Sequence, residues 1–267
     1  MNPVRNLAKQ RNGTGISNGV KRFLIALQFL TVIPIKIKAV DEKRISKSII
    51  YFPLAGLLLG LILVGASRFL SFLNFEQVYI NIILVISLVF LTAGMHLDGL
   101  ADTADALLSR KNKEEMLRIM RDSHIGVMGV LAIISIILLK IAFLSSVNVS
   151  LKTISLLLMC TLSRWSLVLA MFLFPYARQE GKAKIFIQRM NFKTFISSTI
   201  IALVCTVAIW QLRGLFIIAV TAVSAYIIGN FINKKIGGIT GDTLGAMNEV
   251  IEVIVLFSIC LFERIIL

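Results

Sequence analysis

Seven long apolar stretches restrict what this chain can fold into. Crossing the hydrocarbon core of a bilayer takes roughly 17–25 mostly apolar residues, and the backbone must satisfy its own hydrogen bonds there. The whole chain is 57% hydrophobic and only 16% charged, against about 25% charged residues in soluble domains. We therefore predict an all-α integral membrane protein, a helical bundle with transmembrane helices at 49–72, 78–95, 125–147, 153–174, 195–212, 214–232 and 244–262.

An eighth apolar stretch, 22–35, is short and ends near Pro34. No small-residue cleavage site follows it, so we expect an interfacial or re-entrant helix rather than a signal peptide. Residues 1–21 are predicted to be a flexible basic tail. Residues 22–267 are expected to form a single polytopic membrane domain.

The basic residues predict the orientation of the bundle. Five Lys or Arg residues occur in each of the segments 1–22, 36–48, 96–124 and 175–194. With seven spans all four segments lie on one side, which the positive-inside rule makes cytoplasmic. The formal net charge of +14 would suit a nucleic-acid binder, but a mean hydropathy of +0.89 does not. We expect no nucleic-acid partner and a multi-pass protein of the cytoplasmic, or inner, membrane.

Three aspartates follow the second span in one short block. On a helix, Asp102 lies about +40° and Asp105 about −20° from Asp98, so the three share one face. Crowded carboxylates repel unless a cation neutralises them, and Mg²⁺ prefers carboxylates together with substrate phosphate. The block therefore indicates a magnesium site. The alternative is a solvated helix face, which the small and apolar neighbours of these residues disfavour.

Asp122 lies just before the third span, after a run of cations. Ser123, Gly126 and Gly129 predict a tight entry into that span, with backbone donors free to bind an anion. Asp122 is then either a fourth carboxylate at a phosphate site or a cap of the span.

A second acidic group lies near the C-terminus. Asp242 and Glu249 share a helix face, and Glu252 follows one turn later inside an apolar helix, where an unpaired charge is costly. Arg164 is alone in its span and could pair with these glutamates or take part in catalysis. His96 and His124 each adjoin an acidic motif and are either interface residues or catalysts. No further His or Cys suggests zinc.

Carboxylates and cations on one membrane face suit phosphoryl or phosphodiester transfer to an amphipathic acceptor.

The sequence resembles the cobalamin synthase family, the adenosylcobinamide-GDP ribazoletransferases. The resemblance runs from about residue 23 to the C-terminus, in order. Its main blocks are His96–Asp105, Met120–Gly126, Ser163–Arg164, Tyr176–Arg178 and Gly241–Glu249.

The resemblance implies a Mg²⁺-dependent transferase that joins α-ribazole, or its 5′-phosphate, to adenosylcobinamide-GDP and releases GMP. It implies that the catalytic and metal-binding residues are Asp98, Asp102, Asp105 and Asp122. It also implies substrate or phosphate contacts from His96, Arg121, Ser123, His124, Arg164, Arg178, Asp242 and Glu249. Contacts with other late cobalamin-assembly enzymes, and a homo-oligomer, stay open.

Two positions depart from the family pattern: Ala106 stands where Gly is expected, and His124 where Arg or Lys is common. Neither removes a carboxylate. A CDP-alcohol-type phospholipid synthase is a second hypothesis. A cation or substrate transporter is the third, with a pathway formed by Asp98, Asp102, Asp105, Glu249 and Glu252. Transport needs carboxylates near the bilayer midplane, whereas the first Asp set is predicted at the cytoplasmic boundary.

Overall fold

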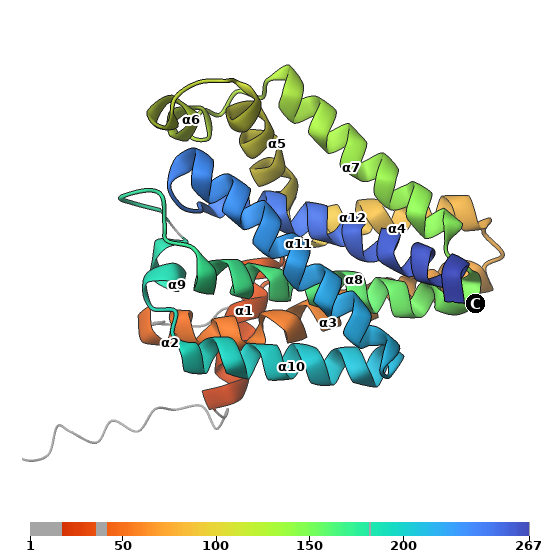
Figure 1. The fold of residues 1–267 in the computed structure, drawn as a ribbon. Coiled ribbons are helices and arrows are strands. Elements are labelled where there is room, and N and C mark those ends of the chain that lie inside the picture. Colours follow the sequence, from red (N-terminus) through yellow and green to blue (C-terminus); the bar gives the residue numbers. More distant parts are fainter. Residues whose placement is uncertain (1–17, 36–41, 182, 267) are drawn as a thin grey trace, which may run out of the picture.

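The fold is a bundle of helices, described here by a computed structural model for residues 18–35, 42–181 and 183–266. Within these residues no strand occurs; Tyr176 and Ile239 form an isolated bridge. Figure 1 shows the arrangement. The helices are α1 Asn18–Leu30, α2 Glu42–Ser48, the 3₁₀ turn η2 Ile49–Tyr51, α3 Phe52–Phe72, α4 Gln77–Leu91, α5 Met95–Leu108, α6 Lys113–Ile119, α7 Val127–Ser146, α8 Val149–Leu173, α9 Lys184–Gln188, α10 Phe192–Trp210, α11 Arg213–Ile236 and α12 Gly241–Ile266.

The predicted membrane bundle is confirmed. Six helices of the described chain are long and apolar enough to span a membrane, and α4 with α5 supplies a seventh if the bent pair is one span. The predicted span 78–95 is too long, because α4 ends at Leu91 and α5 leaves it at 88°. Ala93 and Gly94 have φ values of 53° and 66°, which break the helix. The aspartate block therefore begins a separate helix.

The N-terminal predictions are partly corrected. Residues 18–21, predicted as part of a flexible tail, form the start of α1; residues 1–17 lie outside the described residues. Helix α1 spans most of the predicted 22–35 segment and buries Ile25, Leu27 and Leu30 in the core of the bundle. After α1, the Val32 N–H donates to the Leu91 carbonyl at 2.9 Å, which ties this segment to the end of α4.

Helix α8 is the central element of the bundle. It packs against α3, α10, α11 and α12 (Figure 1) and is the most buried of the six long helices, followed by α12. Small residues allow the closest of these contacts. A methyl group on Gly56 of α3 would lie 2.1 Å from the Cys160 carbonyl oxygen, and one on Gly60 would lie 2.9 Å from the Leu157 Cα. Small residues that let two backbones approach this closely are an ordinary feature of helix packing in membranes.

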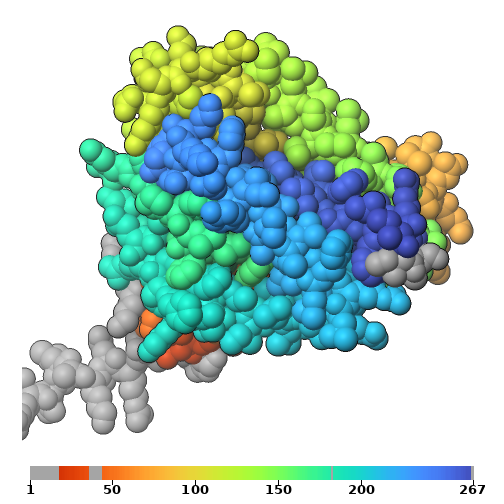
Figure 2. All heavy atoms as spheres, viewed as in Figure 1, coloured from red at the N-terminus to blue at the C-terminus, as the bar shows by residue number. Residues whose placement is uncertain are grey.

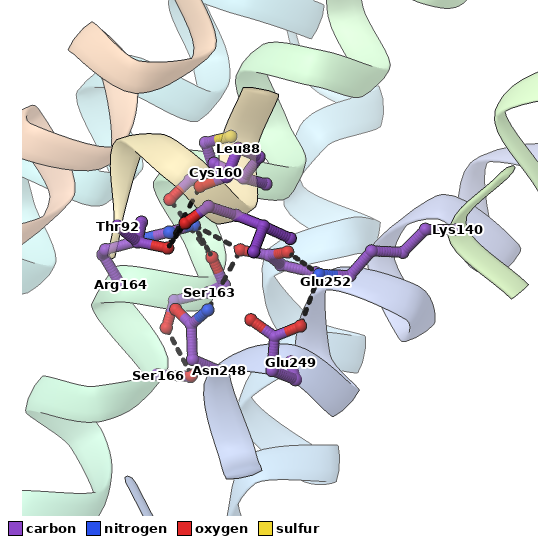
Figure 3. A network of polar contacts seen from close by, with 11 residues as sticks. Leu88, Thr92, Lys140, Cys160, Ser163, Arg164, Ser166, Asn248, Glu249 and Glu252 are labelled. Atoms are coloured by element: carbon purple, nitrogen blue, oxygen red, sulfur yellow. Dashed lines mark hydrogen bonds and ion pairs between the residues drawn. The ribbon is translucent and has the colours of Figure 1, made fainter. Parts of the chain in front are cut away.

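A network of buried charges joins α7, α8 and α12 (Figure 3). Lys140 lies 2.6 Å from the Glu249 carboxylate and also pairs with Glu252, whose other oxygen pairs with Arg164. Asn248 donates to Glu252 at 3.0 Å. Arg164 and Glu252 are completely buried. The two positive charges of the cations balance the two negative charges of the carboxylates, so each of these buried charges has a partner of opposite sign.

The close approach at Gly56 predicts a sharp difference between two glycines of the same helix. Gly56→Ala would force α3 away from the α8 backbone and destabilise the protein by about 1–3 kcal/mol. A methyl group on Gly65 would have no atom within 4 Å, so Gly65→Ala should be neutral or stabilise the helix by up to ~1 kcal/mol. Thermal unfolding of the purified variants in detergent measures both, and equal midpoints would contradict the packing described.

Neutralising one member of the charge network should be costly. Glu252→Gln leaves Arg164 and Lys140 with one carboxylate between them, for an expected loss of about 3–5 kcal/mol. The matched control is Glu76→Gln at an exposed position, expected to change stability by less than ~0.5 kcal/mol. The unfolding midpoints of the two variants measure this difference in stability. A Glu252→Gln protein as stable as the control would show that the network contributes little to the stability of the fold.

Candidate functional site

The close contact between α5 and α12 positions the first two carboxylates. Gly99 faces the α12 backbone so tightly that a methyl group there would lie 2.6 Å from the Asp242 carbonyl oxygen. Gly245 in turn would place a methyl group 3.2 Å from the His96 Cα. Because neither glycine has a side chain, the helices meet backbone to backbone. The contact brings Asp98 and Asp102 of α5 beside the first turn of α12.

Local capping fixes the start of α12. The Thr240 N–H donates to the Thr243 hydroxyl at 2.8 Å, and the Thr243 N–H donates to the Thr240 hydroxyl at 3.2 Å. This reciprocal arrangement is that of a capping box. It holds Asp242 in the first turn, where a negative charge is favoured by the helix dipole.

The segment after α8 brings a cation to Asp242. The Ala177 N–H donates to the Ile239 carbonyl at 2.9 Å, and the Ile239 N–H donates to the Pro175 carbonyl at 2.8 Å. Gly238 has φ +152°, and a methyl group there would lie 2.5 Å from the Pro175 oxygen. The pairing places Arg178 Nη2 2.6 Å from Asp242 Oδ2.

Four carboxylates and the Arg178 guanidinium lie close together where α5 meets the start of α12. Asp102 lies within electrostatic reach of Asp98, Asp105, Asp242 and Arg178. The buried Arg178 Nε has no hydrogen-bond acceptor among the described residues. A concentration of negative charge with an unsatisfied guanidinium beside it is suited to a cation together with an anionic group.

A cavity of about 370 Å³ opens beside these groups. His96, Asp98, Arg178 and Asp242 line it, and its remaining side chains are mostly apolar or aromatic. The wall is built from α1, α3, α5, α8, α9 and α12, together with the segment around Tyr176. The cavity thus lies at one end of the bundle, where α8 ends and α12 begins.

Asp105 has a role that sequence reasoning missed. Its carboxylate accepts from the N–H groups of Gly126 at 2.6 Å and Gly129 at 2.9 Å. It therefore caps the start of α7 and takes two of the backbone donors expected to be free there, and this cap comes from Asp105 rather than from Asp122. A methyl group on either glycine would lie within 2.5 Å of the Asp105 carboxylate, which explains why the helix entry has glycines.

Asp122 lies on an exposed loop together with Arg121, Ser123 and His124. The Asp122 carboxylate is 2.6 Å from His124 Nδ1. The hydrogen bonds from His124 lower the pKa of Asp122, and the same contact raises the pKa of His124 above its ordinary value of 6.5. None of the four lines the cavity, so their predicted contacts with metal, phosphate or nucleotide stay predictions.

Arg164 and Glu249 belong to the buried network and do not line the cavity. Of the two interpretations of Arg164, the structure favours a counter-ion to Glu252. His96 does line the cavity, although it is only 3% exposed and its Nδ1 has no partner among the described residues. Its imidazole is also within electrostatic reach of Arg164 and Glu252, so His96 lies between the cavity and the charge network.

Several residues of this region were not found from sequence. Lys140 completes the charge network, and a single Lys within an otherwise apolar span was the signal for it. Phe29, Phe52 and Phe186 form one wall of the cavity. Apolar residues of three separate segments carry no local pattern that distinguishes a cavity wall from ordinary core.

The donor set fits Mg²⁺ without forming a complete protein cage. Among the described residues no three His, Cys, Asp or Glu side chains form a group that could hold a metal ion, so the four predicted ligands are not gathered into one. Mg²⁺ is usually held by one or two carboxylates, substrate phosphate and water. Asp98 and Asp102, one turn apart with Asp242 opposite, supply hard oxygen donors of that kind.

Comparisons with known proteins agree over nearly the whole chain. A family model described as cobalamin-5-phosphate synthase matches residues 22–260. Relatives named adenosylcobinamide-GDP ribazoletransferase include one from Caldanaerobacter subterraneus subsp. tengcongensis, 38% identical over 90% of this chain and 98% of the relative. Others are from Desulforamulus reducens, 34% identical over 90% and 96%, and Clostridioides difficile, 34% identical over 91% and 98%.

No solved structure matches the chain. The predicted resemblance is confirmed by the family match and by these full-length relatives. The matched residues include the aspartate helix α5, the segment carrying Arg178 and the start of α12. The chain belongs to the cobalamin-5-phosphate synthase family.

Proposed function

We propose that this protein is an adenosylcobinamide-GDP ribazoletransferase of cobalamin biosynthesis, joining α-ribazole or its 5′-phosphate to adenosylcobinamide-GDP with release of GMP. The names of its full-length relatives support the activity. The observation that carries the proposal is the pairing of Arg178 with Asp242 opposite Asp98, at the edge of a cavity that is otherwise largely apolar. Such a site combines anion and cation binding with room for an apolar substrate part.

We propose Mg²⁺ as the cofactor, held by Asp98 and Asp102, with Asp242 close enough to assist. When bound, the ion would neutralise charge on the diphosphate oxygens. Asp105 is already committed to two backbone donors of α7. Its contribution is therefore to hold α5 and α7 in register and to add negative charge near Asp102.

The protein's own groups would handle the remaining charge and the proton. Arg178, with its unsatisfied Nε, would bind the diphosphate of the donor. An acceptor hydroxyl oxygen forms the new bond to the cobinamide-linked phosphorus, the bond from that phosphorus to the GMP oxygen breaks, and GMP leaves. A carboxylate of the site accepts the hydroxyl proton.

We propose that this end of the bundle faces the cytoplasm and that the membrane is the inner membrane. Exposed basic residues surround it on α6, on its flanking connections and at the end of α11: Arg110, Lys111, Lys113, Arg118, Arg121, Lys234 and Lys235. Figure 2 shows the α6 region, the end of α11 and the segment around α9 bordering the same end of the molecule. This distribution agrees with the positive-inside rule.

The transporter hypothesis loses its main support. Glu249 and Glu252, the carboxylates deepest in the bundle, are paired with Lys140 and Arg164 and do not line the cavity. A cation pathway needs carboxylates open to the transported ion. For the phospholipid-synthase hypothesis, no contact among the described residues favours a lipid acceptor over a nucleoside.

GMP release tests the proposed reaction directly. Purified protein with adenosylcobinamide-GDP, α-ribazole and Mg²⁺ should release GMP, and omission of Mg²⁺ or α-ribazole should stop it. Asp102→Asn should lower the rate by ~10²-fold or more, because it removes a charge that neutralises the metal. Glu76→Gln, at an exposed position just before α4, is the control and should keep full activity.

Failure of the folded wild type to release GMP under these conditions would overturn the proposed function. CMP release with a CDP-alcohol and a lipid acceptor would then identify the phospholipid-synthase activity instead. Full GMP release from Asp102→Asn would preserve the reaction and reject the metal site.

Arg178 should act on the donor substrate. Arg178→Ala should raise the KM for adenosylcobinamide-GDP by ~10-fold or more, while Arg178→Lys should recover part of the loss, because lysine keeps the charge without the bidentate fork. Steady-state kinetics with varied donor measure the effect. The control is Arg213→Ala, exposed at the other end of α11; an equal change in both variants would rule out a specific role for Arg178.

A further inference from the structure

The side chains that line the cavity fall into two chemically distinct sets, a charged half and an apolar half. One half carries the charged side chains Asp98, Arg178 and Asp242. The other is formed by apolar side chains of four helices and contains no charged group: Phe29, Leu30, Phe52, Leu167, Met171 and Phe186. A ligand that fills the cavity must therefore have an apolar end and, a few bonds away, a polar end near the carboxylates.

The aromatic side chains of the apolar half pack on one another. The rings of Phe29 and Phe52 are stacked, with centroids 6.1 Å apart and an interplanar angle of 16°. Phe186 packs on both, with centroid distances of 4.6 Å to Phe29 and 6.0 Å to Phe52. Phe52 and Phe186 are almost completely buried in the core. Aromatic walls of this kind favour a flat ring system.

The volume of the cavity limits which part of the proposed substrates can bind in it. A cavity of about 370 Å³ is at the small end of the range for a drug-sized ligand, ~300–1,000 Å³. It has room for one nucleoside, whereas a corrin ring with its side chains is far larger. The candidates for the cavity are therefore the guanosine of the donor and the acceptor nucleoside.

Hydrogen bonding separates these two candidates. Guanine has donors and acceptors on its edge, and an apolar wall would leave them unsatisfied. The base of α-ribazole is a bicyclic aromatic ring whose outer edge carries methyl groups and no exocyclic polar group. Such a base loses little on leaving water, and its ribose hydroxyls would then lie on the charged side of the cavity.

Building on the proposed function, we infer that the cavity is the acceptor subsite: the Phe29–Phe52–Phe186 wall binds the apolar base of the acceptor nucleoside and directs its ribose toward Asp98 and Asp242. The GDP part of the donor then lies outside the cavity, on the side of Arg178 and the exposed basic residues. The wall would determine specificity by rejecting bases with polar edges.

Equilibrium dialysis without adenosylcobinamide-GDP tests this assignment independently of catalysis. The wild-type protein should bind α-ribazole even without Mg²⁺, and should bind an α-riboside of adenine ~10-fold or more weakly. Phe186→Ala should weaken α-ribazole binding by ~10-fold or more. Binding of GDP in the presence of Mg²⁺ should stay within about two-fold for the same variant.

Phe143→Ala is the matched control, because Phe143 packs on Phe257 at a centroid distance of 5.5 Å and does not line the cavity. This variant should bind α-ribazole and GDP with the affinity of the wild type. Should Phe186→Ala not fold, the comparison of the two α-ribosides on the wild type decides alone. Weakened GDP binding with unchanged α-ribazole binding would assign the cavity to guanine and overturn the inference.

Equal binding of the two α-ribosides, or no α-ribazole binding with one lipid per chain found by mass spectrometry, would also overturn the inference. These outcomes are separate from the proposed function, which depends on GMP release. A protein that releases GMP but gives any of them has the proposed activity and a different acceptor site.

Discussion

The rest of the structure depends on how the bundle neutralises charge away from water. Lys140, Arg164, Glu249 and Glu252 form a closed, electrically neutral network among α7, α8 and α12. Removing one partner from such a network is far more costly than losing a surface ion pair, so the three helices are held in one relative position. The end of α8 leads to Arg178, and the start of α12 carries Asp242. The network therefore also fixes the framework on which the site is assembled.

The carboxylates divide into those that hold the fold and those that are free for chemistry. Glu249 and Glu252 are neutralised by cations within the bundle, and Asp105 accepts from two backbone donors at the start of α7. Asp98 lies on the cavity wall instead. The proposed metal and diphosphate would therefore have ligands available at α5 and α12, while the remaining acids keep these helices in place. This division explains how one membrane bundle contains so many acidic groups and still pairs those buried deepest.

The sequence predicts the spans well because a long apolar run has few alternatives in a membrane. It also predicts the helical aspartate block, since Asp98, Asp102 and Asp105 share a face at helical spacing. It does not predict the 88° break before α5. The apolar run continues up to this point, and the positive φ values of Ala93 and Gly94, which break the helix, cannot be recognised from hydropathy. The partners of Asp105 and Arg164 lie 21 to 88 residues away, and no local pattern encodes such a distance. Phe186 was missed for the same reason, because its neighbours come from other helices. Lys140 did have a local signal, as a single Lys within an apolar span, but its partners lie on another helix.

The central claim is that the metal and diphosphate bind between α5 and the start of α12 rather than at the exposed loop around Asp122. Electron paramagnetic resonance of Mn²⁺, titrated into the purified protein with GDP present, tests it most directly. We predict about one bound Mn²⁺ per chain, with affinity reduced ~10-fold or more by Asp98→Asn and by Asp242→Asn and unchanged by Asp122→Asn. Loss of Mn²⁺ binding in Asp122→Asn, with full binding retained in Asp98→Asn and Asp242→Asn, would contradict it.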